Sequence, residues 1–324
     1  MTLIARLGVS VIAMTLLSPS SASELQFQLG GLRSTADSKP TYSWALEYGR
    51  PFGKHLSGSF AWLNEGHVPG HRRDGQAAQL WWHAAGPSEG PIYRFGLGPY
   101  RYFDTTVGPS PESHINAHGW GMIASADASW PLAGKWIASL RANRVHVNRD
   151  VRSTAIVGGI GYRFESAGEE SRGVFARSSA ASPARWELDV MGGATVSNDF
   201  HSQVEFAKAI GLRVGIADHL SGSLAYLREG KFQRGWREGI APQIWLEDDL
   251  TDRLAVAVGI GPYLARSSFR MPDGSNAPAK SILVSISAAY IITPEWRGRL
   301  IWNRVATTYD ENADVFLFAI GYRF

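Results

Sequence analysis

A four-residue sequence occurs twice in this chain, near its midpoint as Gly161–Phe164 and again as its last four residues, Gly321–Phe324. Each copy closes a stretch in which bulky apolar residues alternate with small or polar ones. Because side chains on a strand point alternately to its two faces, Phe316, Phe318 and Phe324 would share one face. The pattern predicts strands with one bulky apolar face and one face of small or polar residues.

The repeat belongs to an internal duplication of the whole chain. Further segments match in the same order along both halves, which indicates two copies of one structural unit. The matching pairs are 56–63 with 220–227, 98–100 with 261–263, and 143–145 with 303–305.

Each copy divides into eight strand-like segments. Strands of about nine to eleven tilted residues can cross a bilayer, and only a closed barrel satisfies every backbone group in lipid. The sequence therefore predicts an all-β protein, a membrane antiparallel β-barrel; a soluble β-sandwich with its apolar faces turned inward is the alternative. The segments begin near Leu25, Thr41, Leu56, Gly75, Ile92, Gly119, Lys135 and Thr154, and near Trp186, Ser202, Leu220, Gly239, Leu254, Ser281, Glu295 and Asp314.

The segment between the copies decides between one barrel and two. Residues 165–184 are rich in Ser, Ala, Glu and Arg without periodicity, which is typical of a flexible linker. A linker of this length favours two tandem eight-stranded barrels, at 24–164 and 185–324, over one sixteen-stranded barrel. The longest predicted loop, 105–118, is too short to constrict a wide pore.

Composition narrows the protein class. Residues 1–23 have the basic start, short apolar run and small-residue tail of a secretory signal peptide. The chain has no Cys, which excludes disulfides and thiolate metal sites. Beyond the signal, no apolar run reaches the length of a membrane helix, about 18 residues. The net charge of +3 comes without a basic stripe, so we expect no nucleic-acid partner, and no motif indicates a cofactor.

The alternating strands and the terminal aromatic residue resemble the small bacterial outer-membrane barrels of the OmpA, OmpX and PagL type. The resemblance implies the outer membrane of a Gram-negative bacterium as the location, after removal of the signal peptide. It also implies that Phe324 is part of the signal read by the barrel-assembly machinery. Outer-membrane lipid and lipopolysaccharide would then be the surroundings and partners of the protein.

Charged residues on the predicted inner faces indicate lumens filled by ion pairs. The second copy repeats Glu65 as Glu229, Arg73 as Arg237, and Asp74 as Glu238. The predicted lumen ion pairs involve Glu65, Arg94, Asp127, Arg141 and Glu229.

Catalytic candidates are few. His146 resembles, in its place on the seventh strand, the His of PagL-type lipid A deacylases, which act with a carboxylate and a Ser two residues after the His. Here that position holds Asn148, and the second copy has Ala306 in place of His146. His146, Glu65 and Asp74 are the catalytic candidates that remain. Four other histidines lie near the predicted extracellular ends of the first copy, His67, His71, His114 and His118; they have no metal-binding spacing, so no metal site is predicted.

Arg144 and its counterpart Arg304 should point outward near the outer rim. Arg makes bidentate contacts to phosphate, so both are predicted to bind lipopolysaccharide phosphates. We therefore expect a structural or interaction role with rim contacts to lipopolysaccharide. A lipid A-modifying acyl hydrolase and a porin-like diffusion channel are the alternatives, and the sequence leaves catalysis open.

Overall fold

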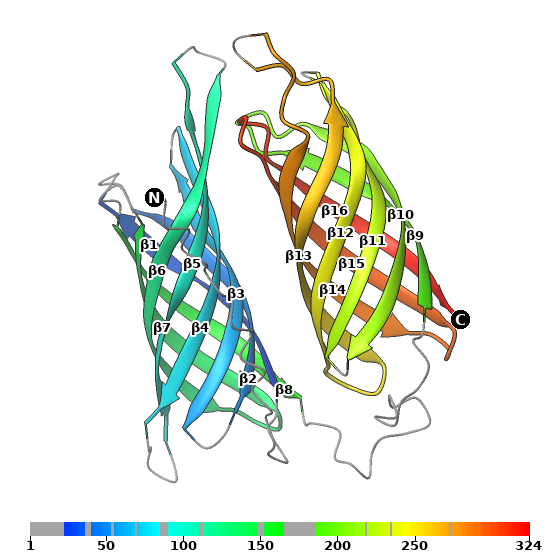
Figure 1. Cartoon of the computed structure of the whole chain (residues 1–324). Coiled ribbons are helices and arrows are strands. Elements are labelled where there is room, and N and C mark those ends of the chain that lie inside the picture. The colour runs from blue at the N-terminus through cyan, green and yellow to red at the C-terminus, as the bar shows by residue number, and fades with distance from the viewer. Residues whose placement is uncertain are drawn as a thin grey trace, which may run out of the picture.

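The chain forms two closed antiparallel barrels of eight strands each (Figure 1). A computed structural model describes residues 23–35, 40–52, 55–68, 70–84, 90–109, 113–147, 152–164, 186–217, 219–233, 235–271 and 274–324. Within these residues, no helix has the length and apolar character needed to span a membrane. The predicted signal peptide and linker lie outside the described residues, apart from Ser23, so both stay predictions.

The first barrel closes by pairing its first strand with its eighth, from Ser23 opposite Phe164 to Ser34 opposite Ser153. Its strands are β1 (Ser23–Ser34), β2 (Thr41–Pro51), β3 (Leu56–Val68), β4 (His71–His83), β5 (Ile92–Val107), β6 (His114–Pro131), β7 (Trp136–Val147) and β8 (Arg152–Phe164).

The second barrel closes in the same way, with Arg323 opposite Glu187. Its strands are β9 (Trp186–Ser197), β10 (Val204–Ala217), β11 (Leu220–Lys231), β12 (Trp236–Asp249), β13 (Leu254–Ser267), β14 (Lys280–Ile291), β15 (Trp296–Ala306) and β16 (Ala313–Arg323). The prediction of two eight-stranded barrels is confirmed, and the sixteen-stranded alternative is wrong, because each set of eight strands closes on itself. We call the end that holds Phe164 and Phe324 the terminal end, and the opposite end the loop end.

The predicted alternation is present along the strands. On β16, Phe318 is 53% exposed whereas Leu317 is 4% exposed. On β6, Trp120 and Met122 are exposed, and Ser125 and Asp127 are buried. Bulky apolar residues therefore cover the outer surface, and the buried polar residues of these strands lie in the lumen, the distribution of a barrel that faces lipid.

Some strands are longer than predicted. The segment 105–118, expected to be a loop, is mostly strand, because β5 continues to Val107 and β6 begins at His114. Figure 1 shows this hairpin extending beyond its neighbours at the loop end. The apolar periodicity stops before the strands do, since their outer ends pair through backbone groups that need no apolar side chain.

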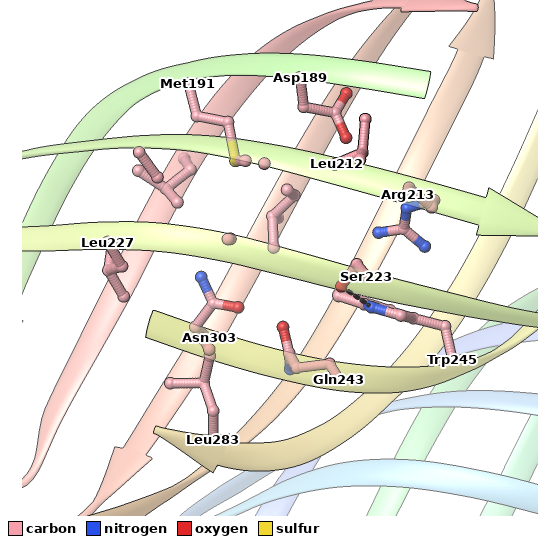
Figure 2. A pocket seen from close by; sticks show the side chains of 16 residues that line it. Asp189, Met191, Leu212, Arg213, Ser223, Leu227, Gln243, Trp245, Leu283 and Asn303 are labelled. Atoms are coloured by element: carbon pink, nitrogen blue, oxygen red, sulfur yellow. Dashed lines mark hydrogen bonds between the residues drawn. The ribbon is translucent and has the colours of Figure 1, made fainter. Parts of the chain in front are cut away.

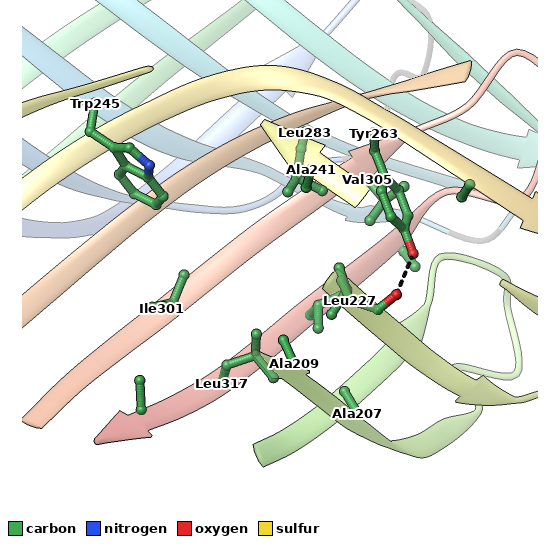
Figure 3. Close-up of a cluster of buried hydrophobic side chains, with 14 of the residues drawn as sticks. Ala207, Ala209, Leu227, Ala241, Trp245, Tyr263, Leu283, Ile301, Val305 and Leu317 are labelled. Atoms are coloured by element: carbon green, nitrogen blue, oxygen red, sulfur yellow. Dashed lines mark hydrogen bonds between the residues drawn. The ribbon is translucent and has the colours of Figure 1, made fainter. Parts of the chain in front are cut away.

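The inner face of each barrel is polar near both ends and apolar in the middle. On β11 the inward positions run from Ser221 and Ser223, near the terminal end, through Ala225 and Leu227 to Glu229. Apolar side chains around Leu227 and Tyr263 form the middle layer of the second barrel (Figure 3). Polar networks thus lie on both sides of an apolar layer.

Candidate functional sites in the lumens and on the outer faces

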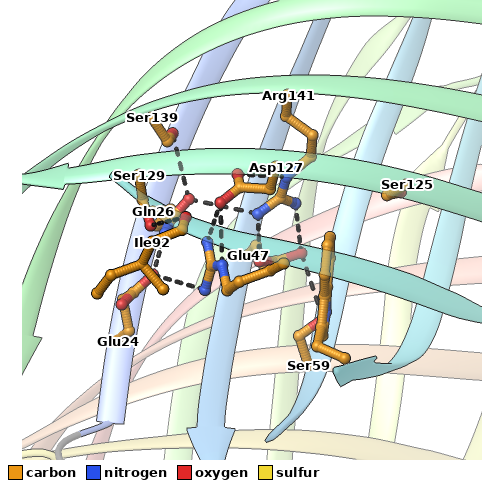
Figure 4. A network of polar contacts seen from close by, with 12 residues as sticks. Glu24, Gln26, Glu47, Ser59, Ile92, Ser125, Asp127, Ser129, Ser139 and Arg141 are labelled. Carbon is orange, nitrogen blue, oxygen red and sulfur yellow. Dashed lines mark hydrogen bonds and ion pairs between the residues drawn. The ribbon is translucent and has the colours of Figure 1, made fainter. Parts of the chain in front are cut away.

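An ion-pair network fills the first lumen toward its terminal end (Figure 4). The Arg141 guanidinium donates to both carboxylate oxygens of Glu47, at 2.7 and 2.8 Å, and its Nε donates to Asp127 at 3.1 Å. Arg94 donates to Asp127 at 2.9 Å and to Glu24 at 3.2 Å. Each buried charge therefore has an opposite charge in contact, which is the condition for burying it.

A tryptophan packs against this network. The Arg141 guanidinium lies 4.6 Å from the centre of a Trp81 ring, whose indole N–H donates to Ser59 at 2.8 Å. Gly96 lies beside the ring, and a Cβ at that position would come within 2.7 Å of it. The glycine is thus required by the close approach of the indole, not by backbone freedom.

A second network lies near the loop end of the same lumen. Glu65 accepts a hydrogen bond from the Tyr100 hydroxyl at 2.8 Å and another from Ser153, and it lies 3.7 Å from Arg73. Arg73 also contacts Asp104 at 3.3 Å. Glu65 is therefore held by several donors inside the lumen.

The second barrel has an equivalent pair at its loop end. Arg237 donates to both oxygens of Glu229, each at 2.6 Å, and also to the Tyr309 hydroxyl at 2.9 Å. Both charged side chains are fully buried. A bidentate pair of this kind fixes the geometry as well as the charge balance.

Toward the terminal end, the second lumen holds a different set of ion pairs. Arg299 contacts Glu187 at 2.6 Å, and Arg213 contacts Glu247 at 2.7 Å. Beside them is a cavity of about 30 Å³, which Asp189 and Arg213 line (Figure 2). That volume accommodates about one or two water molecules and no larger solute.

A hydrogen-bonded row is common to both lumens. Gln79 donates to Ser125, which donates to Asn143, at 3.0 and 2.7 Å. The second barrel repeats the row with distances of 2.8 and 2.6 Å; its residues are Gln243, Ser285 and Asn303. The duplication has therefore retained the arrangement inside the barrels.

The three catalytic candidates lie in three different environments. Glu65 is inside the lumen, Asp74 lies on the outer face of β4, and His146 is exposed on the outer face of β7. Asp74 accepts from Asn64 at 2.6 Å and from Arg304 of the other barrel at 3.2 Å. The structure does not bring these three residues together.

Three of the other predicted histidines, His71, His114 and His118, also have separate partners. His71 contacts Asp104, whereas His114 and His118 contact backbone oxygens of the second barrel. Among the described residues, no group of three or more His, Cys, Asp or Glu side chains is arranged to hold a metal ion.

The two arginines predicted to bind lipid phosphate differ in exposure. Arg144 is exposed and donates to Thr154. Arg304 is 2% exposed, since it lies between the barrels and contacts Asp314 and Asp74. The prediction that Arg304 faces lipid is therefore wrong, because alternation along a strand gives the direction of a side chain and not what lies beyond it.

Sequence reasoning missed the lumenal tryptophans and the contacts between the barrels. Trp81 and Trp245 occupy equivalent positions, and each donates to a serine at 2.8 Å. Their repetition in the two copies is the signal that could have found them. For residues such as Asp248, which contacts Arg50 of the other barrel at 3.2 Å, the sequence pattern holds no such signal.

No family model matches the chain, and no curated protein matches it. Solved structures give low-identity matches. The N-terminal β-barrel domain of Pseudomonas aeruginosa OprF is 11% identical, with 44% of this chain and 97% of that chain covered and a TM-score of 0.36. The attachment invasion locus protein Ail of Yersinia pestis is 14% identical, with coverages of 46% and 100% and a TM-score of 0.33. The Pseudomonas putida toluene transporter TodX is 7% identical, with coverages of 95% and 89% and a TM-score of 0.25.

Proposed function

We propose that this protein is a non-conducting tandem barrel of the Gram-negative outer membrane, with a structural or interaction role and rim contacts to lipopolysaccharide. The observation that carries the proposal is the combination of an apolar outer face with a filled lumen in both barrels. An apolar outer face requires lipid around it, and a lumen filled by ion pairs leaves no wide water path.

Conductance tests the filled lumens. Purified full-length protein in planar bilayers should give no discrete channel steps, because Arg141 and Arg237 are each held by buried carboxylates within the lumen. A porin reconstituted in the same way is the positive control. Regular steps that depend on the amount of this protein would contradict the proposal and favour the channel alternative.

The rim contact is assigned to Arg144. The exposed Arg144 guanidinium is near the loop end. In this proposal the loop end lies on the outer side of the membrane, at the height of lipopolysaccharide phosphates. Arg144→Ala should weaken lipopolysaccharide binding in a vesicle pull-down, whereas Arg253→Ala, at the terminal end, should not. Equal binding by both variants would remove the contact from the proposal.

Lipid A composition tests the enzymatic alternative. Cells with and without the protein should show the same acyl pattern by mass spectrometry, because His146, Glu65 and Asp74 lie apart. A loss of one acyl chain that depends on His146 would overturn the structural role and assign a hydrolase.

A further inference from the structure

Some outward-pointing side chains of the first barrel are buried. Trp62 is 1% exposed, although its neighbours Ala61 and Leu63 are the residues that face the lumen. Its equivalent in the second barrel, Tyr226, is 43% exposed. Trp62 is covered by Trp302 of the second barrel, with ring centroids 3.9 Å apart. The outer face around Trp62 therefore contacts protein and not lipid.

A charged cluster lies beside the paired indoles. Arg304 contacts Asp314 of its own barrel and Asp74 of the first barrel, the latter at 3.2 Å. Its guanidinium also lies 4.9 Å from the centre of the Phe103 ring, which is 1% exposed. A buried arginine with two carboxylates and an aromatic face is a specific contact, since loss of any charged partner leaves buried charge unbalanced.

Two loops of the second barrel complete the contact at the loop end. Asn116 donates its backbone N–H to Asp310 Oδ1 at 2.7 Å, and Arg72 donates to Ser202 Oγ at 3.1 Å. Asp310 and Ser202 are also the described non-glycine residues with positive φ, at 61° and 51°. The sparsely populated backbone conformation thus occurs at the two loops that contact the first barrel.

A separate contact holds the barrels near the terminal end. Asp248 on β12 accepts hydrogen bonds from Tyr48 and, at 3.2 Å, from Ser23, and it pairs with Arg50 at 3.2 Å. Contacts near both ends fix the relative orientation of the barrels, which a single contact would leave free to pivot.

Near the loop end the contact is head-to-tail, since its central residues lie on β3–β6 of one barrel and on β15–β16 with their connecting loop in the other. A contact of this kind can repeat through the equivalent faces near the loop end, β11–β14 and β7–β8, where Tyr226, Arg266 and Arg144 are exposed. The terminal end of β12, with Asp248, belongs to the contact within the chain. On β11–β14, Glu238 is the equivalent of Asp74. The cross-strand neighbours of Glu238 are Arg228 and Arg266, whereas those of Asp74 are Asn64 and Phe103.

These replacements change the charge that an approaching barrel would meet. Arg228 and Arg266 pair with Glu238 at 3.6 and 3.0 Å, and their side chains are 51% and 78% exposed. On the other free face, β7–β8, Arg144 is the counterpart of Arg304. Its cross-strand partner is Thr154, whereas the cross-strand partner of Arg304 is Asp314. Docking of a second chain would therefore bring three arginines around one carboxylate, which is unfavourable.

We propose that the second barrel is the lateral membrane partner of the first, and that the two copies have diverged so that this pairing forms once within each chain. We call the contact the inter-barrel seam; its central residues are Trp62, Asp74, Asn116, Trp302, Arg304 and Asp310. This inference does not depend on the lipopolysaccharide contact.

Cross-linking of the full chain tests the seam. The chain has no Cys, so Asn116→Cys with Asp310→Cys introduces the only thiols. A short bismaleimide should join them within one chain in native membranes, giving a monomer of altered mobility. Asp74→Arg, which opposes Arg304, should abolish this product, whereas Glu238→Arg at the equivalent free position should not. An absent product, or one that Asp74→Arg leaves unchanged, would overturn the seam.

A second pair of introduced thiols tests whether barrels of different chains fail to pair. Ala142→Cys with Tyr226→Cys labels the two free faces and should give no cross-linked dimer. Adding Arg228→Asn, Arg266→Phe and Thr154→Asp restores the residues of the docked faces and should produce dimers between chains. Dimers without these changes, or none with them, would contradict the charge argument.

In both cross-linking experiments, only folded protein that shows heat-modifiable mobility is scored. Asp74→Asn serves as the neutral variant in the first experiment if Asp74→Arg does not fold.

Discussion

Arg141 and Glu47 form a bidentate ion pair across the first lumen, and the same guanidinium also contacts Asp127. One cation therefore balances two carboxylates that come from different strands. Because β7 and β2, which carry Arg141 and Glu47, are not neighbours in the barrel, the pair connects the wall through its interior. The lumen network is thus part of what holds the barrel closed.

Arg141→Met should lower the free energy of unfolding by about 3–5 kcal/mol, because it leaves buried carboxylates without their cation. Urea unfolding in phospholipid vesicles measures the change. Arg163→Met is the control: Arg163 is more exposed and lies 3.5 Å from Glu24, so we expect a loss below about 1 kcal/mol. Equal losses for the two variants would show that the network adds nothing beyond surface pairing.

Gly96→Ala should destabilise the first barrel by about 1–3 kcal/mol, since the added methyl would overlap the Trp81 ring. Gly259→Ala should do the same against Trp245 in the second barrel. Gly215→Ala, where nothing lies within 4 Å of the new methyl, is the control and should be nearly neutral. The same unfolding assay decides, and a neutral Gly96→Ala would mean that the indole can move aside.

Much of the fold could be predicted from the sequence, because alternation directly reports which face of a strand is apolar. The pattern places Trp120 and Ser125 on opposite faces, and the structure has them so. The duplication predicts a repeated lumen, and Gln79 and Gln243 do lie in equal environments. The ends of strands were less predictable, as at His114, where backbone pairing continues but the alternation of bulky apolar with small side chains does not.

The seam could not be predicted, because a residue that faces lipid and one that faces a second barrel have the same position in the alternation. Trp62 and Tyr226 are both large, aromatic and outward-pointing. Only the docking of the two barrels makes the difference: Trp62 is 1% exposed and Tyr226 is 43% exposed. The same ambiguity explains the wrong prediction that Arg304 contacts lipid.

Phe324→Ala should reduce the yield of assembled protein far more than Phe164→Ala. Phe324 directly follows β16 and is 65% exposed, and we propose that it is part of the signal read by the barrel-assembly machinery. Phe164 instead packs edge-on against Tyr162, with centroids 5.0 Å apart, inside the chain. A pulse-chase insertion assay measures both variants, and equal effects would contradict the proposed role of Phe324.

The close pair of Trp62 and Trp302 gives a spectroscopic test of the seam. Two indoles with ring centroids 3.9 Å apart should couple electronically and give an exciton couplet, two bands of opposite sign, in the ultraviolet circular dichroism spectrum. Trp62→Ala should remove this signal, and so should Asp74→Arg, which keeps both indoles but opposes Arg304. Tyr226→Ala, at the equivalent lipid-facing position, should leave it intact. If the signal survives in Asp74→Arg, the Arg304–Asp74 pair does not hold the barrels together, which would contradict the seam as proposed.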